Sequence, residues 1–344
     1  MIPNGLKDSR SAPATAKRAV LALKVAVSGC LIALLLYKLD AQMILSHVRT
    51  LDGLVIASML VVVLLQTCIL AGLRLQFALQ AIGTRLPFRA TAQIALSGLF
   101  VEQVAFGFAG GDATRLLLLR RAQVPFSQSL AGLLSDRAIG LGSLLILSMI
   151  GIHEVFGLLA ALDLGISIAA ASVLAILLGV ALVALLLHRQ RLSAEVARLV
   201  HGIRAKVPPG RTWSCLAAVF ALALTIHILN VLVMWLPARD MQLPLSLAQG
   251  LIIIPTVLLV SMLPIGTGGW GVREGMMVLV LGQLGIAAEQ AIVPPLMFGT
   301  ATLLATLPGS IVWAYTRNSH AAGARSVQDQ AGCGECPTTK DGRI

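Results

Sequence analysis

The sequence consists mainly of long apolar stretches that are separated by short polar segments. Six of these stretches have roughly the 17–25 residues that an α-helix needs to cross a hydrocarbon core of about 30 Å. The six predicted full transmembrane helices cover residues 19–37, 54–73 with a continuation toward Gln80, 128–150, 165–187, 213–236 and 290–314. Because helices satisfy their own backbone hydrogen bonds in lipid, the pattern predicts an all-α polytopic membrane protein.

A further apolar region, residues 92–121, is interrupted by glycines and by charged side chains. Gly110 and Gly111 predict a break in the helix, and Asp112 then suits the N-cap of a short helix over 113–122. Positive charge lies on both flanks, so we expect a re-entrant hairpin that enters and leaves the membrane on the cytoplasmic side. Non-helical backbone is tolerated at that depth only where it is buried in protein or lines a wet cavity.

Residues 245–286 form a second broken apolar region, with a predicted kink at Pro255 and a split over 264–271. This region forms either a re-entrant hairpin from the outer face or two full spans, and symmetry with the first hairpin favours re-entrance. In both regions a glycine pair is followed, after three residues, by an arginine. Two such breaks, one in each half of the chain, predict an inverted repeat with a binding site at the repeat interface.

The composition agrees with a membrane protein and locates its cytoplasmic side. The chain is 57% hydrophobic and 12% charged, and soluble domains carry about twice that fraction of charge. Its net charge of +11 is also typical of nucleic-acid binding. However, most of the 26 Lys and Arg lie in five segments that alternate with the apolar regions, as the positive-inside rule requires. These segments are residues 1–24, 73–91, 112–126, 188–212 and 316–344.

This charge distribution predicts a multi-pass protein of the bacterial inner membrane with both termini in the cytoplasm and no nucleic-acid partner. The predicted parts are a basic N-terminal segment (1–18), a transmembrane domain (19–315) with an amphipathic cytoplasmic loop (188–212), and a disordered cytoplasmic tail (316–344). The tail contains Cys333 and Cys336, which supply only half of a tetrahedral zinc site. We therefore predict no metal site and no cofactor.

Four motifs are similar to those of one family of membrane proteins. They are Gly110-Gly111-Asp112-Ala113-Thr114-Arg115, Asp136-Arg137, Pro264-Ile265-Gly266-Thr267-Gly268-Gly269-Trp270-Gly271-Val272-Arg273-Glu274 and Leu307-Pro308-Gly309. On these motifs the chain resembles, over about residues 15–316, the flippase-like transmembrane family. That family includes the membrane region of lysylphosphatidylglycerol synthases and relatives linked to hopanoid and glycolipid pathways.

The resemblance implies lipid translocation and a fold with re-entrant helices. Family members commonly have a proline shortly before the first glycine pair, where this chain has Phe106-Gly107-Phe108-Ala109. The first break is therefore expected to differ in shape from that of its relatives. The aminoacyl-transferring domain of the synthases has no counterpart in the sequence, so we do not expect transferase activity.

The candidate lipid-headgroup site combines the two breaks with a charged pair in the third full span. Its residues are Gly110, Gly111, Asp112, Arg115, Asp136, Arg137, Gly268, Gly269, Trp270, Arg273 and Glu274. Helix N-termini offer free N–H groups and partial positive charge to a phosphate. Arg115 and Arg273 add bidentate donors for its oxygens, and the carboxylates either bind a headgroup amine or balance the arginines.

The spacing of the charged and polar side chains predicts how they pair. Arg273 and Glu274 are adjacent, so we expect them to point apart rather than to pair with each other. Asp136 and Arg137 either contact the headgroup or form a buried structural pair with the arginines of the hairpins. His227 and Asn230 share one face of a helix, where such side chains usually form hydrogen bonds to a neighbouring helix.

We therefore expect a lipid translocase that moves an anionic phospholipid, a glycolipid or a related lipid between leaflets. One alternative is an intramembrane enzyme or an accessory subunit of lipid biosynthesis, for example of hopanoids or glycolipids. Another is a secondary transporter of ions or small molecules. The sequence contains no HExxH or GxSxG motif, so we predict no catalytic residue. The expected partner is a membrane lipid with an anionic headgroup, together with a second copy of the chain or a lipid-biosynthesis protein.

Overall fold

A computed structural model describes residues 39, 41–104, 107–160, 209–262 and 268–314. Their regular secondary structure is helical throughout. The elements are α2 (Ala41–Thr50), α3 (Gly53–Leu65), η1 (Gln66–Leu70), α4 (Ala71–Ala81), α5 (Phe88–Val104), α6 (Gly107–Arg121), α7 (Phe126–Ala160), α10 (Pro209–Asp240), α11 (Leu247–Ser261), α12 (Val272–Gly282), α13 (Ala288–Ala291) and α14 (Val293–Thr306). The predicted spans 19–37 and 165–187, most of the loop 188–212 and both terminal segments lie outside the described residues.

Four helical stretches in the described part of the chain are long and apolar enough to cross a membrane. They cover Gly53–Ala81, Phe126–Met149, Gly210–Asp240 and Ala288–Ala314. These stretches match the four predicted spans that fall on described residues. Large apolar side chains, such as those of Leu54, Trp213 and Ile311, are exposed on these stretches, as expected of a surface that faces lipid. The chain is therefore a multi-pass membrane protein.

One long helix provides the frame of the molecule. α3, η1 and α4 form a continuous helix of 29 residues, which extends about 43 Å at about 1.5 Å per residue. Within it, η1 is a π-helical segment in which the N–H of Ala71 donates to the carbonyl oxygen of Gln66. Single π turns inside α-helices are frequent at functional sites.

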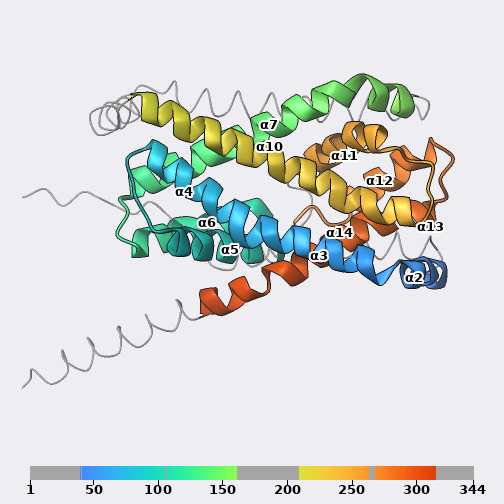
Figure 1. The fold of residues 1–344 in the computed structure, drawn as a ribbon, viewed down its shortest axis with the longest axis horizontal. Coiled ribbons are helices and arrows are strands. Elements are labelled where there is room, and N and C mark those ends of the chain that lie inside the picture. The colour runs from blue at the N-terminus through green and yellow to red at the C-terminus, as the bar shows by residue number, and fades with distance from the viewer. Residues whose placement is uncertain (1–38, 40, 105–106, 161–208, 263–267, 315–344) are drawn as a thin grey trace, which may run out of the picture.

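Two helix pairs are attached at opposite ends of this frame (Figure 1). The pair α5–α6 is connected to α4 and α7 at the end where Thr84 Oγ1 donates to Gln128 Oε1 at 2.9 Å. The pair α11–α12 is connected to α10 and α13 at the other end, where the N–H of Asp52 donates to Asp240 Oδ2 at 2.8 Å. The inner ends of the two pairs approach each other in the middle of the molecule.

The apolar interior contains two main clusters, one toward each end of the molecule. The first lies among α3, α10, α11, α12 and α14, and it includes Met59, Val63, Met234, Ile254 and Met277. The second lies among α4, α5, α6 and α7, and it includes Leu75, Leu79, Leu119 and Leu133. Along the long helix, the buried polar side chains of Gln66 and Thr67 fall between the two clusters. The middle of the molecule is therefore where polar groups collect.

Candidate functional site

The first helix break lies earlier in the chain than predicted. α6 begins at Gly107 and continues through Gly110 and Gly111, so the prediction of a break at this glycine pair is wrong. Asp112 lies inside the helix and is not an N-cap, again in contrast to the prediction. A Cβ atom on Gly111 would lie 2.8 Å from the carbonyl oxygen of Gly98 on α5. Gly111 therefore allows α5 and α6 to pack closely, whereas the sequence analysis expected it to break the helix.

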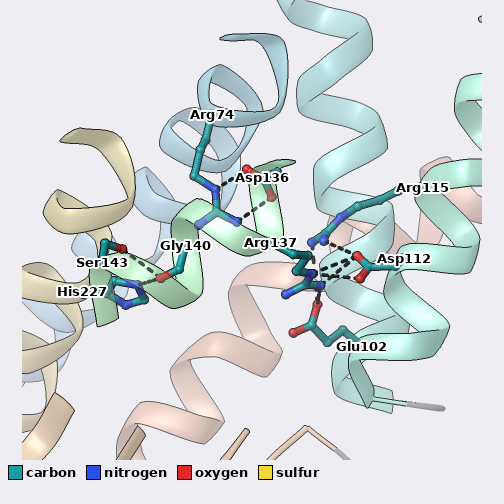
Figure 2. A network of polar contacts seen from close by, with 9 residues as sticks. All are labelled: Arg74, Glu102, Asp112, Arg115, Asp136, Arg137, Gly140, Ser143 and His227. Carbon is teal, nitrogen blue, oxygen red and sulfur yellow. Dashed lines mark hydrogen bonds and ion pairs between the residues drawn. The ribbon is translucent and has the colours of Figure 1, made fainter. Parts of the chain in front are cut away.

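Four charged side chains from three helices form an ion cluster beside this break (Figure 2). Asp112 Oδ1 on α6 lies 2.9 Å from Arg115 Nη1 and 2.8 Å from Arg137 Nη2 on α7. Glu102 Oε2 on α5 lies 3.1 Å from Arg137 Nη2 and 3.6 Å from Arg115 Nη2. The side chains of Arg115 and Glu102 are only 6% and 9% exposed, whereas those of Asp112 and Arg137 are 31% and 25% exposed. The ion cluster thus has a buried side and an accessible side.

Asp136 does not join the ion cluster, although it precedes Arg137 in the chain. Its two oxygens accept hydrogen bonds from Nε and Nη2 of Arg74 on α4, at 2.7 and 2.8 Å. Figure 2 shows that Asp136 and Arg137 reach different neighbouring helices. Both residues form ion pairs, as the structural alternative predicted, but the predicted partners are wrong: Arg137 binds carboxylates of the first hairpin, and Asp136 binds Arg74. Two parallel hydrogen bonds favour this match, since the guanidinium and carboxylate planes are complementary.

The second helix break lies where the sequence predicted it. α11 ends at Ser261 and α12 begins at Val272. Gly268, Gly269 and Gly271 have φ angles of 58°, 78° and 85°. These angles belong to the left-handed region, which glycine adopts without steric cost. The backbone of this break therefore requires glycine, in contrast to that of Gly110 and Gly111.

A buried charged pair opens α12. Glu274 Oε2 accepts the N–H of Gly271 at 2.6 Å, and Glu274 Oε1 accepts from Arg273 Nε at 3.1 Å. The prediction that the adjacent side chains of Arg273 and Glu274 point apart is therefore wrong. Both are almost fully buried, so separating them would leave two uncompensated charges in the interior. The guanidinium carbon of Arg273 also lies 5.3 Å from the centre of the Trp270 ring and 5.0 Å from that of Phe298, within cation–π distance.

Trp270 connects the second break to the first. Its indole Nε1 donates to Gln103 Oε1, in the last turn of α5, at 3.3 Å. A Cβ atom on Gly268 would lie 3.1 Å from the same Gln103 oxygen, and a Cβ atom on Gly299 of α14 would lie 2.7 Å from Cη2 of the Trp270 ring. Absent side chains at these two glycines allow Trp270 to pack between α5 and α14. The breaks of the two halves are therefore in direct contact.

A cavity of about 160 Å³ lies beside the ion cluster and the Arg74–Asp136 pair. Its polar lining includes Gln66, Arg74, Arg115, Asp136 and Asn230. Sequence reasoning did not include Gln66 and Arg74 in the site, and it placed Arg74 in a cytoplasmic segment. In the structure Arg74 lies within the Gly53–Ala81 helix and is half-buried. Both residues could have been found from the sequence, because an arginine and a glutamine occur along one apolar span. A charged residue within such a span usually indicates a functional site.

His227 forms the hydrogen bond to a neighbouring helix that the sequence predicted. Its Nε2 lies 3.1 Å from the carbonyl oxygen of Gly140 on α7, so this nitrogen carries the hydrogen and donates it (Figure 2). Asn230, which lies nearly one turn further along α10, instead lines the cavity. The two residues therefore have different roles, with His227 joining α10 to α7 and Asn230 contributing an amide to the polar interior.

The sequence of the chain matches a known membrane-protein family over most of its length. The family described as the lysylphosphatidylglycerol synthase TM region matches residues 21–309. The matched range contains both breaks, the ion cluster and the cavity. No curated protein is a significant match to the chain.

Proposed function

Because the chain belongs to the lysylphosphatidylglycerol synthase transmembrane-region family, we propose that it is a lipid translocase that moves a phosphate-bearing headgroup between leaflets. One observation carries this proposal. Two helix pairs start from opposite ends of the molecule, and their breaks meet where Trp270 donates a hydrogen bond to Gln103. Buried charges and a polar cavity lie beside this contact. A crossing headgroup needs such a polar position halfway, since each charge costs at least ~2.5–3.5 kcal/mol at the centre of a bilayer.

The arginines of the site suit a phosphate. A guanidinium presents several N–H donors in a plane and binds phosphate oxygens in a bidentate manner. Arg115 belongs to both the ion cluster and the cavity lining, so a phosphate bound there would lie between the two. The cavity of about 160 Å³ is smaller than the ~300–1,000 Å³ of typical small-molecule sites. It therefore accommodates part of a headgroup, while the acyl chains remain in the bilayer.

We also propose how the protein lies in the membrane. The two helix pairs act as re-entrant hairpins, α5–α6 from the cytoplasmic face and α11–α12 from the outer face, within a domain of six full spans. The halves form an inverted repeat, and movement of one against the other exposes the site alternately to each leaflet. The protein resides in the bacterial inner membrane with both termini in the cytoplasm. The attachment of the two pairs at opposite ends of the Gly53–Ala81 helix supports this arrangement.

Lipid movement in proteoliposomes tests the function. We expect purified protein to move acyl-labelled phospholipid between leaflets, and we expect Arg115→Ala to abolish this movement. Arg115→Lys keeps the charge but loses the planar donor set, so its rate should lie between the two. Arg120→Ala is the matched control, because Arg120 lies on the same helix but is exposed, and it should move lipid at the wild-type rate.

Three results would reject the proposal. The first is wild-type protein that moves no lipid. The second is an Arg115→Ala variant that is folded, by gel filtration and circular dichroism, and moves lipid normally; this result would indicate an accessory role instead. The third is ion flux without lipid movement, which would identify a secondary transporter.

A further inference from the structure

The buried charges around the two breaks sum to zero. Over the described residues, the arginines of the site pair with carboxylates in three separate groups. The groups are Arg74 with Asp136, Arg115 and Arg137 with Glu102 and Asp112, and Arg273 with Glu274. Four arginines therefore face four carboxylates. The site is polar but not cationic, and this balance restricts the ligand that it can accept.

A purely anionic headgroup fits such a site poorly. A phosphate that takes the N–H donors now bonded to Asp112 or Glu102 displaces that carboxylate from its arginine. A displaced Glu102 would lose an ion-pair partner in the protein interior, which is the costly outcome for a buried ion pair. A headgroup that also carries an ammonium group removes this cost, because the ammonium takes the place of the arginine beside the carboxylate.

We propose that the headgroup carried by this site is zwitterionic, with a phosphate that binds Arg137 and Arg115 and an ammonium group that binds Asp112 and Glu102. The inference deepens the proposed lipid translocation and rests on it. The accessible side of the ion cluster consists of one residue of each sign, Asp112 and Arg137. An arriving zwitterion therefore meets both of its partners at once and exchanges the ion pair between Asp112 and Arg137 for two ion pairs with the ligand. This inference replaces the expected anionic headgroup with a headgroup that carries both charges.

Two phospholipids that differ only in the headgroup alcohol test this inference. Vesicles contain the wild-type protein and a trace of phosphatidylcholine or phosphatidylglycerol, each with the same fluorescent acyl chain. We expect phosphatidylcholine to move at least ~10-fold faster, a ratio that corresponds to about 1.4 kcal/mol. Equal rates, or faster movement of phosphatidylglycerol, would overturn the zwitterion inference while upholding lipid translocation.

A binding measurement separates the failure of this inference from the failure of the function. Native mass spectrometry of protein taken from vesicles with equal amounts of both lipids should show bound phosphatidylcholine in excess. If neither lipid moves but this excess is found, translocation is wrong and the headgroup class stands. If neither lipid moves and no excess is found, both proposals are wrong.

Changing the charge of the ion cluster provides the second test. Asp112→Asn gives the cluster a net positive charge, so we expect the rate ratio of phosphatidylglycerol to phosphatidylcholine to rise at least ~5-fold. Glu102→Gln makes the same change from α5 and serves where Asp112→Asn does not fold. Asp52→Asn, at the exposed N-cap of α3, should leave the ratio as in the wild type. A folded variant of Asp112 or Glu102 with an unchanged ratio would overturn the inference.

Discussion

Removal of the carboxylate that neutralises Arg74 is the sharpest test of the polar interior. In Asp136→Asn the guanidinium of Arg74 loses its counterion and keeps a neutral side chain of nearly the same size. The two side chains are 16% and 6% exposed and are joined by two short hydrogen bonds. Breaking a buried pair of this kind costs about 3–5 kcal/mol. Because Arg74 borders a polar cavity, we expect a loss near 3 kcal/mol in the free energy of unfolding.

The measurement is reversible unfolding by sodium dodecyl sulfate in mixed micelles, followed by circular dichroism. The double variant Arg74→Met/Asp136→Leu removes both charges, and we expect it to unfold within about 1.5 kcal/mol of the wild type. The control is Asp52→Asn, since asparagine and aspartate are equally good N-caps. Loss of an exposed ion pair lowers the free energy of unfolding by less than about 1 kcal/mol. If Asp136→Asn lowers it by no more than this, the pair is not buried as described and the reasoning fails.

Three further predictions concern the second break and use the same unfolding measurement. Gly269→Ala places a Cβ atom at a φ of 78°, which should cost about 1–2 kcal/mol, whereas Gly53→Ala, at an uncrowded position, should have little effect. Gly299→Ala forces both Arg273 and Trp270 to move and should cost about 1–3 kcal/mol, with a change in the near-ultraviolet circular dichroism of tryptophan; an unchanged spectrum would contradict this packing. Trp270→Phe loses the hydrogen bond to Gln103 and should cost about 0.5–1.5 kcal/mol, compared with almost nothing for the exposed Trp213.

The membrane spans could be predicted because their signal is local. A run of apolar residues of sufficient length is enough, whatever it packs against. The four stretches that the structure describes, including Gly53–Ala81 and Phe126–Met149, therefore agree with the sequence analysis to within a few residues, apart from extensions of the helices at their polar ends.

The two glycine pairs show where local reasoning fails. Gly268-Gly269 and Gly110-Gly111 are alike in sequence, yet the first adopts positive φ angles and the second lies inside a helix. Glycine permits both left-handed backbone and close helix packing. Which of them occurs depends on the opposing surface, and for Gly111 this is the backbone of Gly98.

Ion pairing was the other feature beyond the reach of the sequence. Arg74 and Asp136 are 62 positions apart and meet only because α4 packs beside α7. Adjacency in the sequence did not predict which charged side chains pair. Asp136 and Arg137 have different partners, while Arg273 and Glu274 pair with each other. Most of the charged residues could be predicted, with the exception of Arg74, but their partners are set by tertiary packing.

The division of the apolar interior into two clusters has a mechanical consequence. The cluster around Met234 and Met277 lies mainly on α3, α10, α11, α12 and α14. The cluster around Leu79 and Leu119 lies on α4, α5, α6 and α7. Relative movement of the two ends would leave each cluster intact, provided that the continuous Gly53–Ala81 helix bends. The ion pairs would each travel with one end, because those of Arg74, Arg115 and Arg137 lie among α4, α5, α6 and α7, and that of Arg273 lies within α12. Such a movement would instead alter the packing of α7 on α11 and the hydrogen bond between Trp270 and Gln103.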